Sequence, residues 1–364
     1  MRRRFRGSLA VTALLLSTAS SLAGDADPQE FTQIERGRYL TVLADCASCH
    51  TVPGSGQPFA GGRPIETPFG NIIAPNITPD PETGIGSWSD EQFDAAIRKG
   101  RRRDGSRLYP AMPYNAYTRM PRNDVLAVRA YLNTVTPVRN AVVANALPFP
   151  FNIRAAMRVW DALYFKEGDY QPDPRQSAEW NRGAYLVDGP GHCGACHTPK
   201  TFLGGDKTDQ YLKGAYLQGW SAPDITNDAR LGVGGWSKED LVAYLKSGHN
   251  RITAATGPMG EVVTLSTAYV TDPDLGAIAT YLKSLPGKTS AGSPLPSDDH
   301  AMVAGAAIYR DQCSACHGLD GKGVAELFPS IADSSMVRSD DPTTSIRIVL
   351  RGARSVGTHG DHAA

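Results

Sequence analysis

Every cysteine of this chain belongs to one five-residue pattern, Cys-x-x-Cys-His, which occurs three times. Two thiols three positions apart lie on the same side of a helical turn, so both can form thioether bonds with the vinyl groups of one porphyrin. The histidine that follows then lies where it can bind the iron. The pattern therefore predicts three covalently attached c-type haems (heme c) and a function in electron transfer. The predicted attachment thiols are Cys46, Cys49, Cys193, Cys196, Cys313 and Cys316, and the predicted proximal ligands are His50, His197 and His317.

Two other kinds of site use paired cysteines. Zinc needs four protein ligands, usually from two such pairs that lie close together, whereas these motifs are 147 and 120 residues apart and each has its own histidine. A thioredoxin-like dithiol is expected beside a βαβ pattern, and the sequence shows no such pattern. Three copies that leave no cysteine over therefore favour haem attachment over both zinc and a redox dithiol.

Two methionines follow the first two motifs at the same distance. Met112 lies 62 residues after His50, and Met259 lies 62 residues after His197. Both methionines sit beside a proline, in stretches that we expect to be loops. A thioether opposite the histidine is the usual ligand pair of electron-carrying cytochromes c, although a methionine can also fill a gap in an apolar core. The repeated spacing favours the first interpretation, so Met112 and Met259 are predicted as distal ligands.

The third motif has no methionine at this spacing. His317 plus 62 gives position 379, and the sequence has 364 residues. Met336 lies nineteen residues after His317, in the stretch that corresponds to the middle loop of the other copies, and His359 and His362 lie in a Gly- and Ala-rich tail. None of these three is predicted to bind iron. We therefore leave the third distal ligand unassigned and expect this sequence to be a C-terminally incomplete version of a longer chain.

The sequence around the motifs is repeated as well. Arg36–Leu40 before the first motif matches Arg182–Leu186 before the second, and Pro75–Thr78 matches Pro223–Thr226 at an offset of 148. The chain thus contains two complete copies of one domain and the start of a third. The predicted boundaries are 28–136 for the first copy, 176–285 for the second and 300–364 for the third, with a linker at 137–175 that includes a short helix and a second linker at 286–299.

Each copy is predicted to be a small all-α domain, built from a few short helices around its haem. Apolar residues recur with helical spacing over residues 31–43, before the first motif. Ser89 with Gln92, and Ser237 with Asp240, have the spacing of helix N-terminal capping boxes. The predicted fold class is therefore all-α, with tandem cytochrome c-like domains, two complete and one partial.

The first 23 residues have the features of an export signal. Arginines at positions 2, 3, 4 and 6 precede an apolar and small-residue run that ends with a small residue at each cleavage-site position. We therefore expect an exported protein, in the periplasm or at the periplasmic face of the cytoplasmic membrane. Removal of the signal leaves 33 basic residues (37 − 4) against 37 acidic ones, and so nearly neutral a surface predicts no nucleic-acid partner. No later segment is long and apolar enough to span a bilayer, so any membrane contact is expected to be peripheral or through a partner.

The chain resembles the triple-haem cytochrome c subunit of membrane-associated alcohol, gluconate and related sugar dehydrogenases of Gram-negative bacteria. The resemblance is carried by the three motifs, the exported start, the Arg-Gly-x-Tyr-Leu stretches at 36–40 and 182–186, and the Trp-Ser pairs that begin helices at Trp88 and Trp236. The resemblance covers roughly residues 30–355, and its more specific parts are the three-copy layout and the stretch Ala254–Met259. It implies a separate flavin- or quinone-dependent subunit that oxidises the substrate, and a cytochrome subunit that passes the electrons to ubiquinone. The third methionine and the C-terminal membrane-contacting segment of that family have no counterpart in this sequence.

The leading interpretation is therefore an electron-transfer subunit without a catalytic residue of its own. Methionine and histidine on both faces of two irons leave no open position there for a substrate. Two alternatives stay open at this point. The third haem, with no assigned distal ligand, could serve a self-contained periplasmic haem enzyme of the peroxidase or thiosulfate-oxidising type. The chain could also be a free-standing soluble electron carrier without a dedicated dehydrogenase.

Overall fold

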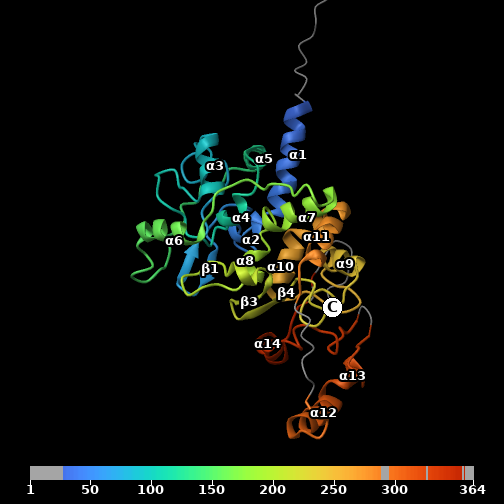
Figure 1. Ribbon diagram of the computed structural model, residues 1–364. Helices are drawn as coiled ribbons and strands as arrows, with labels where there is room; N and C mark the ends of the chain where they lie inside the picture. Colours follow the sequence, from blue (N-terminus) through green and yellow to red (C-terminus); the bar gives the residue numbers. More distant parts are fainter. Residues whose placement is uncertain (1–27, 288–294, 325–326, 355, 357–364) are drawn as a thin grey trace, which may run out of the picture.

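The computed structural model describes residues 28–287, 295–324, 327–354 and 356. The predicted export signal, His359 and His362 lie outside this part of the chain. Figure 1 shows the first two copies of the repeat side by side, with the third copy, in orange and red, next to the second. Within the described residues, no helix has both the length and the apolar character needed to cross a membrane.

The first copy follows the predicted helical order and adds a hairpin. The Ser89 hydroxyl accepts a hydrogen bond from the Gln92 amide, and the Gln92 side chain accepts one from the Ser89 amide, so the predicted capping box is confirmed. Gly100 ends the same helix in the left-handed conformation (φ 59°) that glycine adopts without strain. The elements are α1 (Pro28–Leu43), α2 (Cys46–His50), β1 (Pro64–Thr67), β2 (Gly70–Ile73), α3 (Asp90–Lys99), α4 (Tyr114–Tyr117) and α5 (Arg122–Leu132).

The second copy repeats this order. The capping box predicted at Ser237 is present, and so is a proline in the first turn of the last helix, after an N-cap threonine, Thr271. The elements are α7 (Ala178–Asp188), α8 (Gly194–His197), the 3-10 turn η2 (Thr208–Gln210), β3 (Lys213–Leu217), β4 (Trp220–Asp224), α9 (Lys238–Ser247), α10 (Gly257–Leu265), the 3-10 turn η3 (Thr267–Tyr269) and α11 (Asp272–Ser284).

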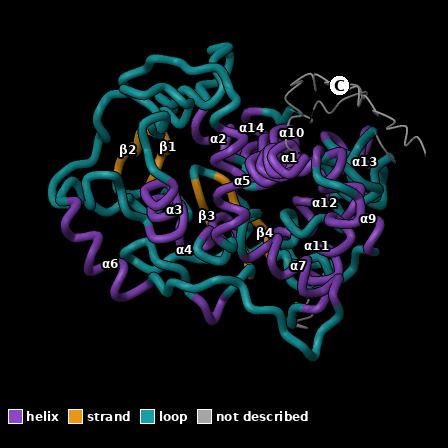
Figure 2. The backbone as a smooth tube through the Cα atoms, turned by 90° about the horizontal axis from the view of Figure 1, so that it is seen from above, coloured by secondary structure: helices purple, strands orange, loops and turns teal. Residues whose placement is uncertain are grey.

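Two antiparallel hairpins depart from the all-α prediction. β1 pairs with β2, and β3 pairs with β4, each as a two-stranded sheet (Figure 2). Both hairpins lie between the motif histidine and the repeated Pro-x-Ile-Thr stretch, which begins at the end of the second strand. Their strands are four or five residues long and largely half-buried, so no alternating apolar pattern marks them in the sequence. The fold is therefore mostly helical with two small hairpins.

In each of the first two copies, the helix before the motif crosses the last helix at a glycine. α1 packs against α5, and α7 packs against α11. A Cβ atom added at Gly37 would lie 1.8 Å from the carbonyl oxygen of Ala127, and one added at Gly183 would lie 2.0 Å from that of Ala277. The two helix backbones are therefore in direct contact, which explains the glycine of the repeated Arg-Gly-x-Tyr-Leu stretch.

The same stretch joins the two copies to each other. One aspartate on each last helix binds an arginine from its own copy and a tyrosine from the other copy. The contacts are Arg36–Asp124 and Tyr185–Asp124 on α5, and Arg182–Asp274 and Tyr39–Asp274 on α11. Because the two tyrosines cross in opposite directions, the arrangement is approximately symmetric. The buried side chains of both copies form one continuous apolar cluster, so the two copies make a single body.

The linker between these copies contains the predicted short helix, with a 3-10 turn before it. The Trp160 indole N–H donates to the carbonyl of Leu203 in the second copy at 3.0 Å. Asp161 accepts a hydrogen bond from the hydroxyl of Tyr114 in the first copy at 2.8 Å. The linker is thereby fixed to both copies. Its elements are η1 (Arg154–Ala156) and α6 (Met157–Tyr164).

The third copy is more open. None of the residues of its first helix is buried, and a Cβ atom added at Gly305 would meet no atom within 4 Å. Its last described helix rests on the second copy: the Thr344 hydroxyl accepts from the Ser221 amide at 2.8 Å, and the Arg347 guanidinium lies 4.6 Å from the centre of the Trp220 ring. The elements are α12 (His300–Gln312), α13 (Ser314–His317) and α14 (Thr343–Arg351).

Candidate haem sites

All three Cys-x-x-Cys-His motifs form a short helical turn. α2 spans the whole first motif, and α8 and α13 begin one residue after the first cysteine of their motifs. The six cysteines are free thiols, and all except the exposed Cys316 are partly buried. Across the described ranges, no group of three or more His, Cys, Asp or Glu side chains is placed to hold a metal ion. The cysteine pairs therefore do not converge on a zinc-type site there.

The three motif histidines share one contact that the sequence did not predict. Nδ1 of each ring donates to a proline carbonyl oxygen: His50 to Pro75 at 2.7 Å, His197 to Pro223 at 2.8 Å and His317 to Pro329 at 2.9 Å. This bond fixes the ring orientation and the tautomer, and it leaves Nε2 as the ring nitrogen that can bind a metal. The available signal is the repeated stretch that starts at Pro75 and Pro223, although the repeat alone does not reveal what those prolines contact.

Burial keeps the donor groups of the first two motifs neutral. It lowers the pKa of His50 and of His197, and the bond to the proline carbonyl only partly offsets this. Burial also raises the pKa of Cys46 and of Cys193 to about 12. A neutral imidazole beside two thiols on one turn fits haem c, which the thiols would hold through thioether bonds and whose iron the imidazole would bind.

The sequence separation of histidine and proline differs in the third copy. The proline follows the histidine by 25 and 26 positions in the first two copies, and by 12 in the third. The difference corresponds to the hairpins β1–β2 and β3–β4, which the first two copies insert at this point. The 62-residue spacing from histidine to methionine therefore cannot be transferred to the third copy, and position 379 is not a valid reference for its distal ligand.

Met112 and Met259 lie in different local structures. Met112 is in the turn before α4, as the sequence predicts, and packs against the shared apolar cluster. The sequence also predicts a loop at Met259, but this residue lies in the first turn of α10, after a left-handed Gly257 (φ 56°) and Pro258. A Gly-Pro pair often marks a loop, whereas proline is also favoured in the first turn of a helix. Both methionines are half-buried.

The first and second motifs lie next to each other across the boundary between the copies. The Tyr117 hydroxyl donates to the Ala44 carbonyl at 2.8 Å, just before the first motif. The Tyr117 ring packs edge-on against His192, which precedes the second motif, with ring centroids 5.4 Å apart. Burial raises the pKa of the Cys196 thiol, and Cys49 is near enough to add to the rise. The two attachment turns therefore meet at one contact.

Asp45, directly before the first motif, is a buried carboxylate at this contact. It is 7% exposed, has left-handed backbone (φ 49°), and its Oδ1 finds no hydrogen-bond partner in the part of the chain that the structure describes. Burial raises its pKa to about 7, and Glu261 adds to the rise. A hydrogen bond from Ser48 and the charge of Arg63 act in the opposite direction.

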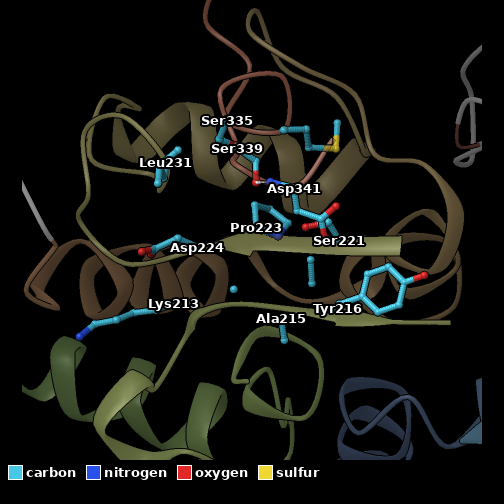
Figure 3. A pocket seen from close by; sticks show the side chains of 13 residues that line it. Lys213, Ala215, Tyr216, Ser221, Pro223, Asp224, Leu231, Ser335, Ser339 and Asp341 are labelled. Atoms are coloured by element: carbon cyan, nitrogen blue, oxygen red, sulfur yellow. Dashed lines mark hydrogen bonds between the residues drawn. The ribbon is translucent and has the colours of Figure 1, made fainter. Parts of the chain in front are cut away.

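The segment that follows the third motif lies against the second copy. The Ser330 amide donates to the Ile252 carbonyl at 3.1 Å, one residue after the proline that binds His317. A cavity of about 270 Å³ lies between residues 335–341 of the third copy and the β3–β4 hairpin (Figure 3). Pro223, the partner of the second histidine, and Met336 both line it. The second copy thus contacts both other copies.

Comparison with known proteins identifies the family. The family model for cytochrome c matches residues 34–136 and 302–363. The chain is 40% identical over 378 residues to the fructose dehydrogenase cytochrome subunit of Gluconobacter japonicus, a match that covers 96% of this chain and 78% of that protein. It is also 40% identical over 364 residues to the cytochrome c subunit of the alcohol dehydrogenase (quinone) of Gluconacetobacter polyoxogenes, covering 95% of this chain and 77% of that protein. The chain belongs to the family of dehydrogenase cytochrome c subunits.

This cytochrome c subunit also has a larger relative. It is 45% identical over 334 residues to a nicotinate dehydrogenase component of Pseudomonas putida, a match that covers 89% of this chain but 28% of that protein. Family membership confirms the resemblance drawn from the motifs and implies covalently bound haem c. A self-contained haem enzyme and a free-standing carrier are not favoured, because these relatives are named as parts of dehydrogenases.

Proposed function

We propose that this cytochrome c subunit holds three haems in two complete domains (28–136 and 176–285) and one partial domain (300–364). It passes electrons from a partner dehydrogenase to ubiquinone and the respiratory chain. The partner is a flavin- or quinone-dependent subunit that oxidises an alcohol, gluconate or another sugar. The protein is exported and works at the periplasmic face of the cytoplasmic membrane, with peripheral membrane association in the full complex.

The proposal rests mainly on the histidine–proline contact that recurs in all three copies. The same Nδ1–H···O=C bond orients His50, His197 and His317, each directly after a pair of thiols. A histidine with only a structural role would not be expected to make the same contact three times, each time beside the same cysteine pattern. When bound, haem c supplies a one-electron iron couple. The chain supplies the thioether anchors and an imidazole of fixed orientation.

Met112 and Met259 are the proposed distal ligands of the first two irons. Each is half-buried and follows its motif histidine by the same 62 residues. A site closed on both faces exchanges electrons and leaves no position for a substrate. Methionine opposite histidine also raises the potential of the iron, which suits a protein that accepts electrons from a dehydrogenase.

The arrangement of the copies supports stepwise transfer between fixed sites. The first two copies share one apolar cluster, and their attachment turns meet at Tyr117 and His192. The third copy contacts the second at Ile252 and Ser330. Electrons can therefore pass along the chain without movement of one copy relative to another. The named function of the fructose and alcohol dehydrogenase relatives supports a dehydrogenase as the donor.

The test is to purify the tagged protein from its native membranes and to measure haem content, partner subunits and potentials. We expect three thioether-linked haems per chain and a co-purifying flavin- or quinone-dependent dehydrogenase. Met112→Leu and Met259→Leu should each lower the potential of one haem while all haems stay attached, because axial ligands set haem potentials over a range of about 0.8 V.

Met120→Leu is the matched control. Met120 is a methionine of the apolar core, 2% exposed, so its replacement should leave every potential unchanged. A content of two haems per chain would contradict the three-haem proposal. Variants at Met112 and Met259 that behave like the Met120 variant would contradict the ligand assignment, and purification as a lone protein would contradict the role as a subunit.

A further inference from the structure

One arginine links the attachment turn of the first copy to a helix of the second. Nη1 of Arg63 donates to the carbonyl of Ser48, which lies between the two cysteines of the first motif. The same guanidinium forms a bidentate ion pair with Glu261, in which Nη2 and Oε2 are 2.9 Å apart. Glu261 lies on α10, two residues after Met259. A single side chain thus joins the first haem-attachment turn to the helix with the proposed distal ligand of the second.

α10 is also held to the first copy at its other end. It packs against α2, and the hydroxyl of Ser266, directly after α10, donates to the carbonyl of Leu43 at the end of α1 at 3.3 Å. The charged contact near the methionine is the stronger of the two, because bidentate arginine–carboxylate pairs fix both distance and orientation. The position of Met259 therefore depends on the first copy as well as on its own.

This link has no equivalent in the opposite direction. Arg63 lies opposite Ala74 in the first hairpin, and the matching residue of the second hairpin, Ala222, pairs with Ala215. The second copy therefore has alanine where the first has Arg63, and alanine cannot form such an ion pair. The Arg63–Glu261 pair is therefore a specific device between the first and second sites, and not a feature of every copy.

The pair lies where its charges act on both sites. Its side chains are 24% and 33% exposed, so water screens them only in part. Arg63 is near enough to Asp45 and Cys49 to interact electrostatically with both. Removal of one partner would leave the other charge half-buried and unpaired beside the first attachment turn.

We propose that Arg63 is a positioning residue for the second iron site. Through Glu261 it holds α10, and with it Met259, in a fixed place against the first attachment turn, and the pair keeps the local charge balanced for both sites. This inference rests on the proposed function, in which Met259 binds the second iron.

Charge balance predicts potential shifts of opposite sign. A positive charge near an iron favours the reduced state and a negative charge favours the oxidised state. The double variant is the reference, because all three variants release α10, which by itself lowers the potential of the second haem. Relative to the double variant, Arg63→Gln leaves Glu261 unpaired and should lower this potential, whereas Glu261→Gln leaves Arg63 unpaired and should raise it. We expect each single change to alter the reduction equilibrium constant roughly three- to tenfold, where tenfold corresponds to about 59 mV.

The positioning role predicts a second, spectroscopic effect. The absorption band of methionine bound to ferric iron should weaken in both single variants and in the double variant, because α10 is no longer held at its N-terminal end. Tyr39→Phe is the matched control, since it breaks a contact between the same two copies, to Asp274 on α11, without touching α10. It should leave the band and the potential unchanged.

The measurements use holoprotein with its thioether-linked haem content verified. Shifts of the same sign in both single variants relative to the double variant, or effects no larger than those of Tyr39→Phe, would overturn the inference. If a single variant does not accumulate, the double variant with exchanged charges, Arg63→Glu with Glu261→Arg, tests the positioning role, because it restores an ion pair. Holoprotein with the band recovered supports the positioning role, and failure to recover it opposes that role. A Met259→Leu variant with an unchanged band would instead refute the ligand assignment itself.

Discussion

Replacing Gly183 with alanine should destabilise the body formed by the first two copies, whereas the same change at Gly305 should not. The two glycines occupy the same place in the repeat, before the second and third motifs. At Gly183 the new methyl group would lie 2.0 Å from the Ala277 carbonyl oxygen and 2.9 Å from the Cβ atom of Tyr281. At Gly305 it would meet nothing within 4 Å. The two helices that cross at Gly183 must therefore move apart, whereas the structure around Gly305 need not change.

The size of the effect follows from two opposing contributions. Alanine is favoured over glycine inside a helix by about 1 kcal/mol, and this gain applies equally at both sites. Overpacking costs about 1–3 kcal/mol, and it applies only where the methyl group collides with backbone that cannot rotate away. The difference in unfolding free energy between the two variants thus isolates the helix crossing, and we expect roughly 1–3 kcal/mol. Gly37→Ala, with a contact of 1.8 Å, should resemble Gly183→Ala.

Urea denaturation of the holoproteins, followed by far-UV circular dichroism and by haem absorbance, measures this difference. The two signals separate loss of helix from loss of the haem environment, which matters because a chain of several domains need not unfold in one step. Equal midpoints for Gly183→Ala and Gly305→Ala, with equal slopes, would refute the reasoning that α7 and α11 touch through their backbones.

The remaining predictions concern the contact between the first two copies. Tyr185→Phe removes a hydrogen bond to the buried carboxylate of Asp124, so it should lower the free energy of unfolding by about 1.5–3 kcal/mol; wild-type stability in the same urea assay would count against the crossed tyrosines. Asp45 has its pKa raised to about 7 by burial, so its protonated form contributes stability in acid that is lost as the pH rises from about 4 to about 7. Asp45→Asn should flatten this part of the pH–stability curve, and a variant curve parallel to that of the wild type would rule out Asp45 as its source.

The sequence predicted those features that depend on neighbouring residues. The helical turns at the three motifs were expected from two thiols and a histidine within five positions. The capping boxes at Ser89 and Ser237 follow from a serine and an acceptor three residues apart. In each case the whole interaction lies within one helical turn, so spacing alone determines it.

Contacts between distant residues were not predictable in the same way. Arg63 and Glu261 are 198 residues apart, and Tyr39 and Asp274 are 235 apart. Nothing in the composition around Arg63 distinguishes it from an arginine on the surface. The repeat did contain partial information, since it marked Pro75 and Pro223 as equivalent, but it could not show that their carbonyl oxygens accept from the motif histidines. Only the folded chain brings these atoms together.

In the first two copies, the segment after the motif both orients the histidine and docks onto another copy. The third copy shows that these two roles can be separated. Its histidine donates to the carbonyl of a proline 12 positions further on. The described residues between them form a single antiparallel bridge, Val324–Phe328, in place of a two-stranded hairpin, so hairpins like β1–β2 and β3–β4 are not required to orient the imidazole. Both hairpins do make contacts outside their own copy. The Gln218 side chain, in the turn between β3 and β4, donates to the Glu66 carbonyl on β1 at 3.3 Å, and the Ser221 amide on β4 donates to Thr344 at the start of α14. The hairpins are therefore best understood as docking elements that fix the distances between copies, while the histidine–proline contact orients the ring of each motif histidine without them.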